Sequence, residues 1–135
     1  MVTIDTNIAF YALTRGDKAD RAEAVLRTAN FLSVQVLNEY AFACRRKFRR
    51  DWVEIAADIR LLRSSVSEIR TIDAFDNDNA LRLAERYQLA FFDALMIAVA
   101  LAHGASVLYS EDMQHGLVID GKLTITNPFL DLAPQ

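Results

Sequence analysis

The sequence predicts an α/β protein with a mostly parallel central sheet. Short apolar runs alternate with longer stretches of helical periodicity, and strands joined through helices usually pair in parallel. Two of the apolar runs stop abruptly at acidic residues, at the edge of an open sheet where ligands bind. The 135 residues, 53% hydrophobic and 24% charged, fit a single globular domain over residues 1–135.

The first predicted strand is the short run before Asp5, with Val2 and Ile4 buried and Asp5 at the rim of the sheet. Residues 8–13 predict a short apolar helix, residues 14–17 a turn, and residues 18–29 a second helix. The apolar residues of the second helix recur at helical spacing and predict its buried face: Ala22, Val25, Leu26 and Ala29.

The next strand, Phe31-Leu32, is very short, and Ser33 is predicted to cap a helix from Val34 to about Phe48. The apolar positions of this helix predict a buried stripe: Val36, Leu37, Tyr40, Ala41, Cys44 and Phe48. Residues 51–54 have the spacing of a capping box and predict a helix to about Ser64. Its predicted inner face is Ile55, Ile59 and Leu62, and Trp52 is interpreted as a core or interface anchor.

The second half of the chain continues the alternation. Residues 67–72 predict a strand, and Asp73 or Asp76 caps a helix that runs to Tyr87. After a connection at 88–92, residues 92–102 form the most apolar helix, which is expected to be buried and to end at His103-Gly104. Residues 105–109 and 123–126 predict the last main strands, with a hairpin-like loop bracketed by Gly116 and Gly121 between them.

Composition excludes several classes of site. The single cysteine, Cys44, rules out an internal disulfide and a cysteine zinc site, and two histidines are too few for a zinc catalyst. The N-terminus does not resemble a signal peptide, and no apolar run reaches the roughly 18 residues of a membrane span, so a cytoplasmic protein is expected. The net charge of −3 predicts nucleic-acid binding only through a local basic patch or bound metal ions.

Three acids, Asp5, Asp93 and Asp112, fall at the carboxyl ends of strands or at helix starts, which share one rim of a parallel sheet. Glu39 lies about six residues into its helix, roughly 9 Å along the axis, and has to reach upward to join them. Several carboxylates in one pocket require compensation, which a hard cation such as Mg²⁺ or Mn²⁺ supplies. Three of these acids also have a plainer interpretation: Asp5 as a helix cap, Asp93 as dipole compensation and Glu39 as a solvated side chain.

The end of the helix near residue 48 is strongly basic, with Arg45, Arg46, Lys47, Arg49 and Arg50. Cations suit the C-terminal end of a helix, but five charges in six residues exceed what the helix dipole needs. Arg45, Arg46 and Arg49 are therefore candidates to contact phosphates of RNA or an acidic partner.

Four short motifs in order carry a family resemblance: Val2-Thr3-Ile4-Asp5-Thr6-Asn7, residues 33–39, Phe92-Asp93-Ala94, and Ser110-Glu111-Asp112. Asn127-Pro128-Phe129 resembles the closing strand of the same family. The whole chain resembles PIN-domain ribonucleases of the VapC toxin type.

The resemblance implies a three-layer α/β/α sandwich and a Mg²⁺-dependent endoribonuclease that acts as the toxin of a toxin–antitoxin pair. It implies an acidic site of Asp5, Glu39, Asp93 and Asp112, with Asn7 and Ser110 as polar support. In Ser110-Glu111-Asp112 the spacing favours Asp112, and Glu111 is a rival. The resemblance also implies a homodimer and an antitoxin whose tail covers the site.

Two other functions remain open at this point. The first is a phosphohydrolase with Asp5 as covalent nucleophile, although Asp5-Thr6-Asn7 lacks the second aspartate two residues on that such an enzyme needs. The second is a non-catalytic domain that binds Mg²⁺ and a partner protein. The favoured hypothesis is hydrolysis of RNA phosphodiesters, with Asp5 and Asp93 on the principal Mg²⁺, and Glu39 and Asp112 holding a second ion or orienting the attacking water.

Overall fold

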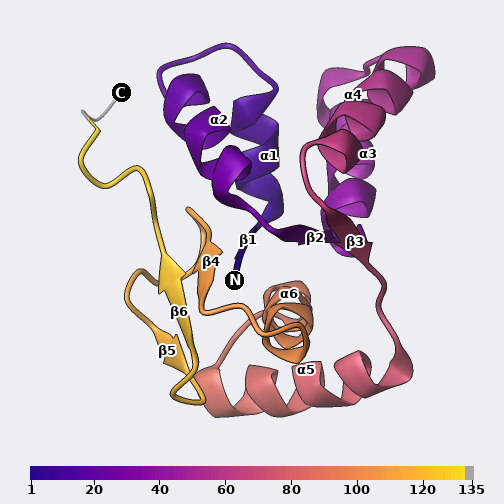
Figure 1. Ribbon diagram of the computed structural model, residues 1–135. Helices are drawn as coiled ribbons and strands as arrows, with labels where there is room; N and C mark the ends of the chain where they lie inside the picture. The colour runs from indigo at the N-terminus through magenta and orange to yellow at the C-terminus, as the bar shows by residue number, and fades with distance from the viewer. Residues whose placement is uncertain (133–135) are drawn as a thin grey trace.

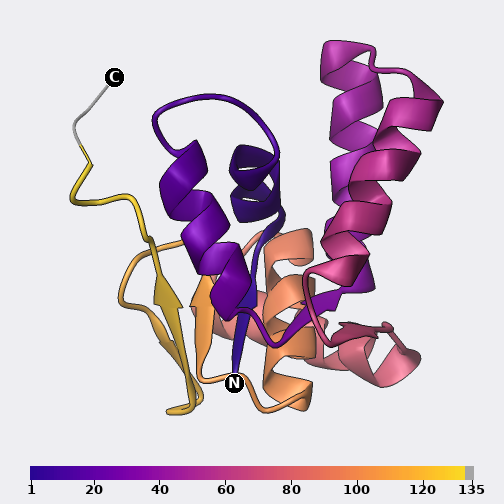
Figure 2. The same cartoon turned by 45° about the horizontal axis from the view of Figure 1, so that its top comes forward.

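The computed structural model describes residues 1–132 and contains a mostly parallel sheet with helices on both sides, as predicted (Figures 1 and 2). Positions 133–135 of the predicted domain lie outside the described residues. The main sheet has the order β1-β4-β6-β5, and its strands are β1 (Val2–Ile4), β4 (Val107–Tyr109), β5 (Val118–Ile119) and β6 (Leu123–Thr126). Only β5 is antiparallel to its neighbour.

A second pair of parallel strands, β2 (Phe31–Ser33) and β3 (Glu68–Arg70), continues this sheet beyond β1. The β1 and β2 segments are joined by three hydrogen bonds. The Val2 backbone N–H donates to Asn30 Oδ1 at 2.7 Å, the Asn30 backbone N–H donates to the Val2 carbonyl at 2.8 Å, and the Thr3 hydroxyl donates to the Phe31 carbonyl at 2.7 Å. The strand predicted at residues 67–72 is shorter than expected, since β3 covers only Glu68–Arg70, but its place in the chain order is as predicted.

The helices occupy the predicted segments with boundaries shifted by one or two residues. They are α1 (Thr6–Ala12), α2 (Ala19–Thr28), α3 (Val34–Phe48), α4 (Trp52–Ser64), α5 (Ala74–Tyr87) and α6 (Phe91–Ala102). Figure 1 shows α1 and α2 on one side of the strands, α5 and α6 on the other, and the α3–α4 hairpin beyond β2 and β3. None of the helices within residues 1–132 combines the length and apolarity that crossing a bilayer requires.

The core lies where α6 meets the strands, and α6 is buried from Ala94 to Ala100, as its all-round apolar sequence predicted. Burying such a helix is favourable because each large aliphatic side chain removed from water contributes about 2 kcal/mol. The predicted inner face of α2 is also confirmed, since all four of its residues are buried. Helix α6 ends at Ala102, and His103 is its C-cap residue. Gly104 follows with a φ of 78°, a conformation that favours glycine.

Three predictions about side chains are wrong. Phe48, predicted in the buried stripe of α3, is 55% exposed, because the last turn of α3 projects past the core and Phe48 stacks only on Phe10, with ring centroids 5.3 Å apart. Trp52, predicted as a core or interface anchor, does not lie in the core, because it is 58% exposed; the guanidinium of Arg45 lies 4.8 Å from its ring centroid. Asp51 precedes α4 without capping it through its side chain.

A complete capping box instead begins α5. The Asp73 carboxylate accepts from the backbone N–H of Asp76, and the Asp76 carboxylate accepts from the backbone N–H of Asp73, both at 3.0 Å. Both of the candidate caps therefore act together. The two boxes differ at the third helical residue, because Asp76 is buried, whereas Glu54 at the same place in α4 is exposed and lies 3.4 Å from the Arg50 guanidinium.

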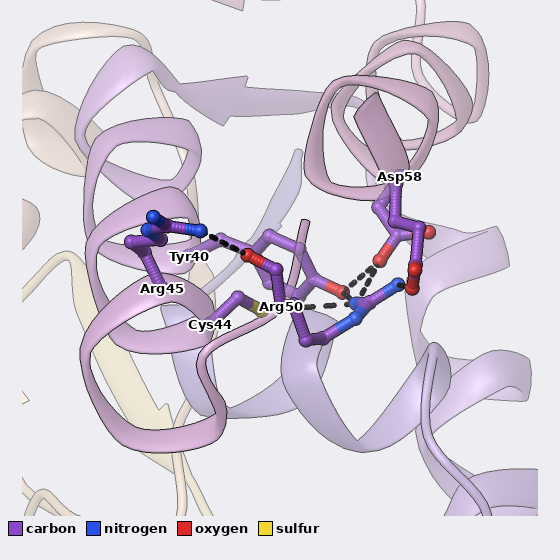
Figure 3. Close-up of polar contacts among 6 residues, drawn as sticks. Tyr40, Cys44, Arg45, Arg50 and Asp58 are labelled. Atoms are coloured by element: carbon purple, nitrogen blue, oxygen red, sulfur yellow. Dashed lines mark hydrogen bonds and ion pairs between the residues drawn. The ribbon is translucent and has the colours of Figure 1, made fainter. Parts of the chain in front are cut away.

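A polar cluster between α3 and α4 holds this hairpin together (Figure 3). Asp58 accepts a hydrogen bond from the buried Tyr40 hydroxyl at 2.6 Å and also pairs with the Arg50 guanidinium. The same guanidinium contacts the Tyr40 hydroxyl at 3.4 Å and Cys44 Sγ at 3.9 Å. Burial and the hydrogen bond to Asp58 raise the pKa of Tyr40, so this phenol stays protonated. Arg50 therefore has a structural task that separates it from the other basic residues of this segment.

We expect Asp58→Ala to lower the free energy of unfolding by about 2 kcal/mol, because it deprives the half-buried Arg50 and the buried Tyr40 hydroxyl of their main acceptor. Urea unfolding monitored by circular dichroism measures this. The matched control is Glu54→Ala, which removes an exposed carboxylate 3.4 Å from the same guanidinium and is expected to cost about 0.5 kcal/mol or less. Equal losses in the two variants would contradict the structural role of Asp58.

Candidate functional site

Asp5 is the centre of the site, at the point where β1 ends and α1 begins. One carboxylate oxygen, Oδ1, accepts from the backbone N–H of Thr6 at 2.8 Å, and Oδ2 accepts from the Ser110 hydroxyl at 2.8 Å. The Asp5 backbone N–H donates to the carbonyl of Tyr109 on β4 at 2.8 Å. Asp5 is only 7% exposed. It therefore caps α1 and lies at the sheet rim at once, so the two interpretations of this residue do not exclude each other.

Ser110 and Asn7 join the segment after β1 to the segment after β4. The fully buried Ser110 hydroxyl accepts from the backbone N–H groups of Asp112 at 3.2 Å and Met113 at 3.3 Å while it donates to Asp5. The Asn7 side-chain amide lies 3.1 Å from Asp112 Oδ2 and 3.4 Å from Asp5 Oδ2. A single amide thus contacts two of the predicted acids, whose positions are 107 residues apart in sequence.

Glu39 and Asp93 complete the group of acids from two other helices. Glu39 lies on α3, is partly buried, and accepts from the Thr6 hydroxyl at 3.3 Å, so the solvated interpretation of this residue is wrong. Thr6 follows Asp5 directly and so links Glu39 to the centre of the site, a role that the sequence analysis did not give it. Asp93 lies in the first turn of α6, and its negative charge raises the pKa values of both Asp5 and Glu39.

The charges of these carboxylates oppose one another. The pKa of Asp5 is raised to about 6, mainly by burial; the hydrogen bonds from Ser110 and Thr6 act to lower it, and the charges of Asp93 and Asp112 act to raise it. Burial and the charge of Asp5 raise the pKa of Glu39, and burial and the charge of Asp112 raise the pKa of Asp93. A site whose acids resist ionisation is one that a positive charge stabilises.

The donor set fits a hard divalent cation, because it consists of carboxylate oxygens with hydroxyl and amide groups beside them. Residues 1–132 contain no group of three or more His, Cys, Asp or Glu side chains that is already arranged to hold a metal ion. The four carboxylates are therefore near enough for their charges to interact without being arranged around one point.

A groove of about 470 Å³ opens beside the acids and reaches the basic end of α3. Glu39 and Asp112 lie in its wall, together with Thr6 and Asn7, which contact Asp5. The remaining lining residues are aromatic, small or basic: Phe10, Tyr11, Phe42, Ala43, Arg46, Lys47 and Phe48. The predicted basic segment and the predicted acidic site are thus parts of one concave surface.

The basic residues of this segment differ in their surroundings. Arg46 lines the groove, and its guanidinium lies 5.6 Å from the ring centroid of Phe42. Arg45 lies over Trp52, and Arg49 ends α3 in a left-handed conformation with a φ of 49°. All three of these side chains are exposed.

Glu111 does not join the other acids. Its carboxylate accepts from the Tyr11 hydroxyl at 2.6 Å and pairs with the Lys18 ammonium, while its neighbour Asp112 contacts Asn7. The structure therefore separates the two candidates that the spacing left open. The sequence did not identify Lys18 or Tyr11 as partners of Glu111, because nothing in the spacing of residues 11, 18 and 111 predicts that they are neighbours.

We expect Asp5→Asn to stabilise the metal-free protein at neutral pH. The pKa of Asp5 in the folded state, about 6, lies above the ordinary value of 3.8. Asp5 therefore contributes most to the stability of the folded state below pH 3.8, and this contribution is lost as the pH rises through 6. At pH 7.5 the ionised carboxylate costs on the order of 2 to 3 kcal/mol, which the isosteric amide avoids.

Thermal unfolding in EDTA at pH 4 and pH 7.5 tests this expectation. The variant should exceed the wild type in stability at pH 7.5 and lose that advantage towards pH 4. Asp78→Asn, at an exposed position on α5, is the control and should show no such dependence. A variant less stable than the wild type at pH 7.5 would refute the electrostatic cost of Asp5.

Three solved structures share this fold. A toxin–antitoxin complex from Klebsiella pneumoniae superimposes with a TM-score of 0.72 at 19% identity, covering 95% of this chain and 98% of that one. VapBC2 from Rickettsia felis, bound to a DNA fragment from its promoter, gives 0.68 at 19% identity over 94% and 98%. The sarcin–ricin-loop-cleaving toxin VapC20 from Mycobacterium tuberculosis gives 0.66 at 19% identity over 83% and 92%.

A comparison with curated proteins finds no match, whereas the sequence profile of the PIN domain matches residues 2–116. The matched segment contains every residue of the acidic group and the segments that carry the predicted resemblance. The chain therefore belongs to the PIN-domain family.

Proposed function

We propose that this protein is a divalent-metal-dependent endoribonuclease and the toxin of a toxin–antitoxin pair. The observation that carries the proposal is that Asp5, Glu39, Asp93 and Asp112 come close together from four separate segments. Burial and the neighbouring charges raise the pKa values of Asp5, Glu39 and Asp93. PIN-family membership supports nuclease chemistry, and the neighbours include a toxin that cleaves the sarcin–ricin loop and two toxin–antitoxin assemblies.

In this proposal Asp5 and Asp93 hold the principal Mg²⁺ or Mn²⁺, and Glu39 and Asp112 hold a second ion or orient the attacking water. When bound, a divalent cation supplies a polarised water and positive charge beside the scissile phosphate. Ser110 donates to Asp5 Oδ2 and favours its ionised form, which a metal ligand requires. Asn7 sets the orientation of Asp112, and Thr6 that of Glu39.

The groove and its basic end are proposed to receive the RNA. Arg46 lies in the groove wall together with Glu39 and Asp112, so a strand whose phosphate reaches the acids also passes this cation. Arg45 and Arg49 are further candidates at the rim for backbone phosphates or for an acidic segment of the antitoxin. We further propose a cytoplasmic homodimer whose antitoxin covers the groove.

The phosphohydrolase alternative is disfavoured by the residue two positions after Asp5. Such an enzyme needs a second aspartate there, and this chain has Asn7, whose amide contacts Asp5 and Asp112. An amide does not exchange protons as a general acid or base. Metal-dependent RNA fragments would also distinguish the proposed nuclease from a non-catalytic Mg²⁺-binding domain.

We expect Asp5→Asn and Asp93→Asn each to reduce Mn²⁺-dependent cleavage by roughly 100-fold or more, because each removes a proposed metal ligand. The measurement is the rate of fragment formation from a structured RNA, with Mn²⁺ or with EDTA. Asp78→Asn, far from the acidic group in sequence and exposed, is the control and should keep the wild-type rate. Metal-dependent cleavage at the wild-type rate by folded Asp5→Asn would overturn the assignment.

We expect Arg46→Glu to weaken RNA binding and to reduce the magnitude of the salt-dependence slope by about 1 or more, since it removes one phosphate contact from the groove. Fluorescence anisotropy with labelled RNA, in an Asp93→Asn background that prevents cleavage, measures both quantities. Arg60→Glu on α4 is the matched control for net charge. Identical losses in both variants would show that only net charge matters.

A further inference from the structure

Lys18, at the start of α2, lies in a small cage of aromatic and acidic side chains. Its ammonium pairs with the Glu111 carboxylate and lies 4.8 Å from the ring centroid of Tyr11 and 5.4 Å from that of Phe129. The two rings also pack edge to face, with centroids 5.4 Å apart. We call Tyr11, Lys18, Glu111 and Phe129 the Lys18 cage. It joins α1, the start of α2, the segment after β4 and the segment after β6.

Glu111 connects this cage to the acidic group. Its side chain is held by Lys18 and Tyr11, while its backbone N–H donates to Asn7 Oδ1 at 3.2 Å. The other end of the Asn7 amide faces Asp112 and Asp5. An unbroken set of contacts therefore runs from Lys18 through Glu111 and Asn7 to two proposed metal ligands.

The cage also keeps the charge of Glu111 away from the other acids. Glu111 precedes Asp112, and a fifth free carboxylate beside the group would add to its mutual repulsion. Burial opposes the charge of Glu111, but the hydrogen bonds from Lys18 and Tyr11 outweigh it, so the pKa of Glu111 falls below its usual value. The hydrogen bond to Glu111 raises the pKa of Lys18. The pair thus stays ionised at neutral pH.

Stability alone does not account for this arrangement. The side chains of Lys18 and Glu111 are 30% and 22% exposed, and partly exposed ion pairs contribute about 1 kcal/mol or less. The geometric consequence is larger, because the Glu111 backbone holds Asn7, and Asn7 contacts two proposed metal ligands. Contacts that orient metal ligands in this way typically change metal affinity by about 10- to 100-fold.

We infer that Lys18, acting through Glu111, is a positioning residue that holds Asn7 and Asp112 in the arrangement that binds the divalent cation. This inference rests on the proposed function and adds a determinant of metal affinity outside the acidic group. Lys18 touches neither substrate nor metal. Its loss should therefore weaken metal binding, while saturating metal restores most of the cleavage rate.

Binding of Mn²⁺ alone to the metal-free protein tests the inference, with free Mn²⁺ measured by electron paramagnetic resonance. Lys18→Met keeps the aliphatic stem between the two rings and removes the charge; we expect the dissociation constant for Mn²⁺ to rise about 10-fold. Lys18→Arg retains the ion pair and should restore most of the affinity. In cleavage assays the Mn²⁺ concentration for half-maximal rate should rise in Lys18→Met, with the rate at saturation close to that of the wild type.

Arg21→Met is the matched control. Arg21 also joins α2 to the segment after β6, through the Pro128 carbonyl and the Asp131 carboxylate, each at 2.7 Å. Within residues 1–132 it makes no hydrogen bond or ion pair with Asn7 or with the acids of the site. Wild-type Mn²⁺ affinity in Arg21→Met together with weakened affinity in Lys18→Met supports the inference. Equal affinities in wild type and Lys18→Met, or equal losses in Lys18→Met and Arg21→Met, overturn it.

Two further results keep the inference separate from folding and from the proposed function. Should Lys18→Met fail to fold, Glu111→Gln replaces it, because the amide keeps a hydrogen bond to Tyr11 but loses the ion pair; wild-type Mn²⁺ affinity in that variant overturns the inference. Absence of Mn²⁺ binding by the wild type overturns the proposed function itself. Wild-type binding that no cage substitution alters overturns only the role of Lys18.

Discussion

The structure of the site depends on keeping several carboxylates close together although they repel one another. Asp5 is the extreme case, since it is almost fully buried and its pKa rises to about 6. The protein offsets part of this cost with donors that it places around the carboxylates, namely the Thr6 backbone N–H, the Ser110 hydroxyl and the Asn7 amide. The remaining unfavourable charge is what gives the site its affinity for a cation, as proposed.

The parallel pairing of β1 and β4 places these donors beside the acids. Because β1 and β4 are parallel neighbours, the segments that follow them emerge at the same edge, and Ser110 reaches Asp5 across one strand spacing. The backbone of Asp5 is itself part of this pairing through the Tyr109 carbonyl. The same hydrogen bonds therefore maintain the sheet edge and orient the acids, so local stability and site geometry cannot be altered independently at these positions.

The elements that the sequence predicted well are those with a long apolar pattern or a clear cap. The range of α3 was predicted from Ser33 and the spacing of its apolar residues, and the burial of α6 from its uniform apolarity. Predictions failed where an apolar residue lies beyond the core, as with Phe48 and Trp52. A periodic pattern identifies the face of a helix but does not tell how far the neighbouring elements extend along it. Asp51 failed for a different reason: the spacing of its capping box is correct, but Glu54, the other member of the box, contacts Arg50 instead.

The sequence by itself determined the order of strands and helices and the positions of Asp5, Asp93 and Asp112 at strand ends or helix starts, because these follow from local periodicity and from the rules of parallel sheets. The resemblance to the PIN family came separately, from short motifs in a fixed order. Only the tertiary structure decided that Thr6 brings Glu39 into the group and that Glu111 turns to Lys18 while Asp112 turns to Asn7. The physical reason is that neighbouring residues share a backbone position but not a side-chain direction, which is set by partners about 100 residues away in sequence.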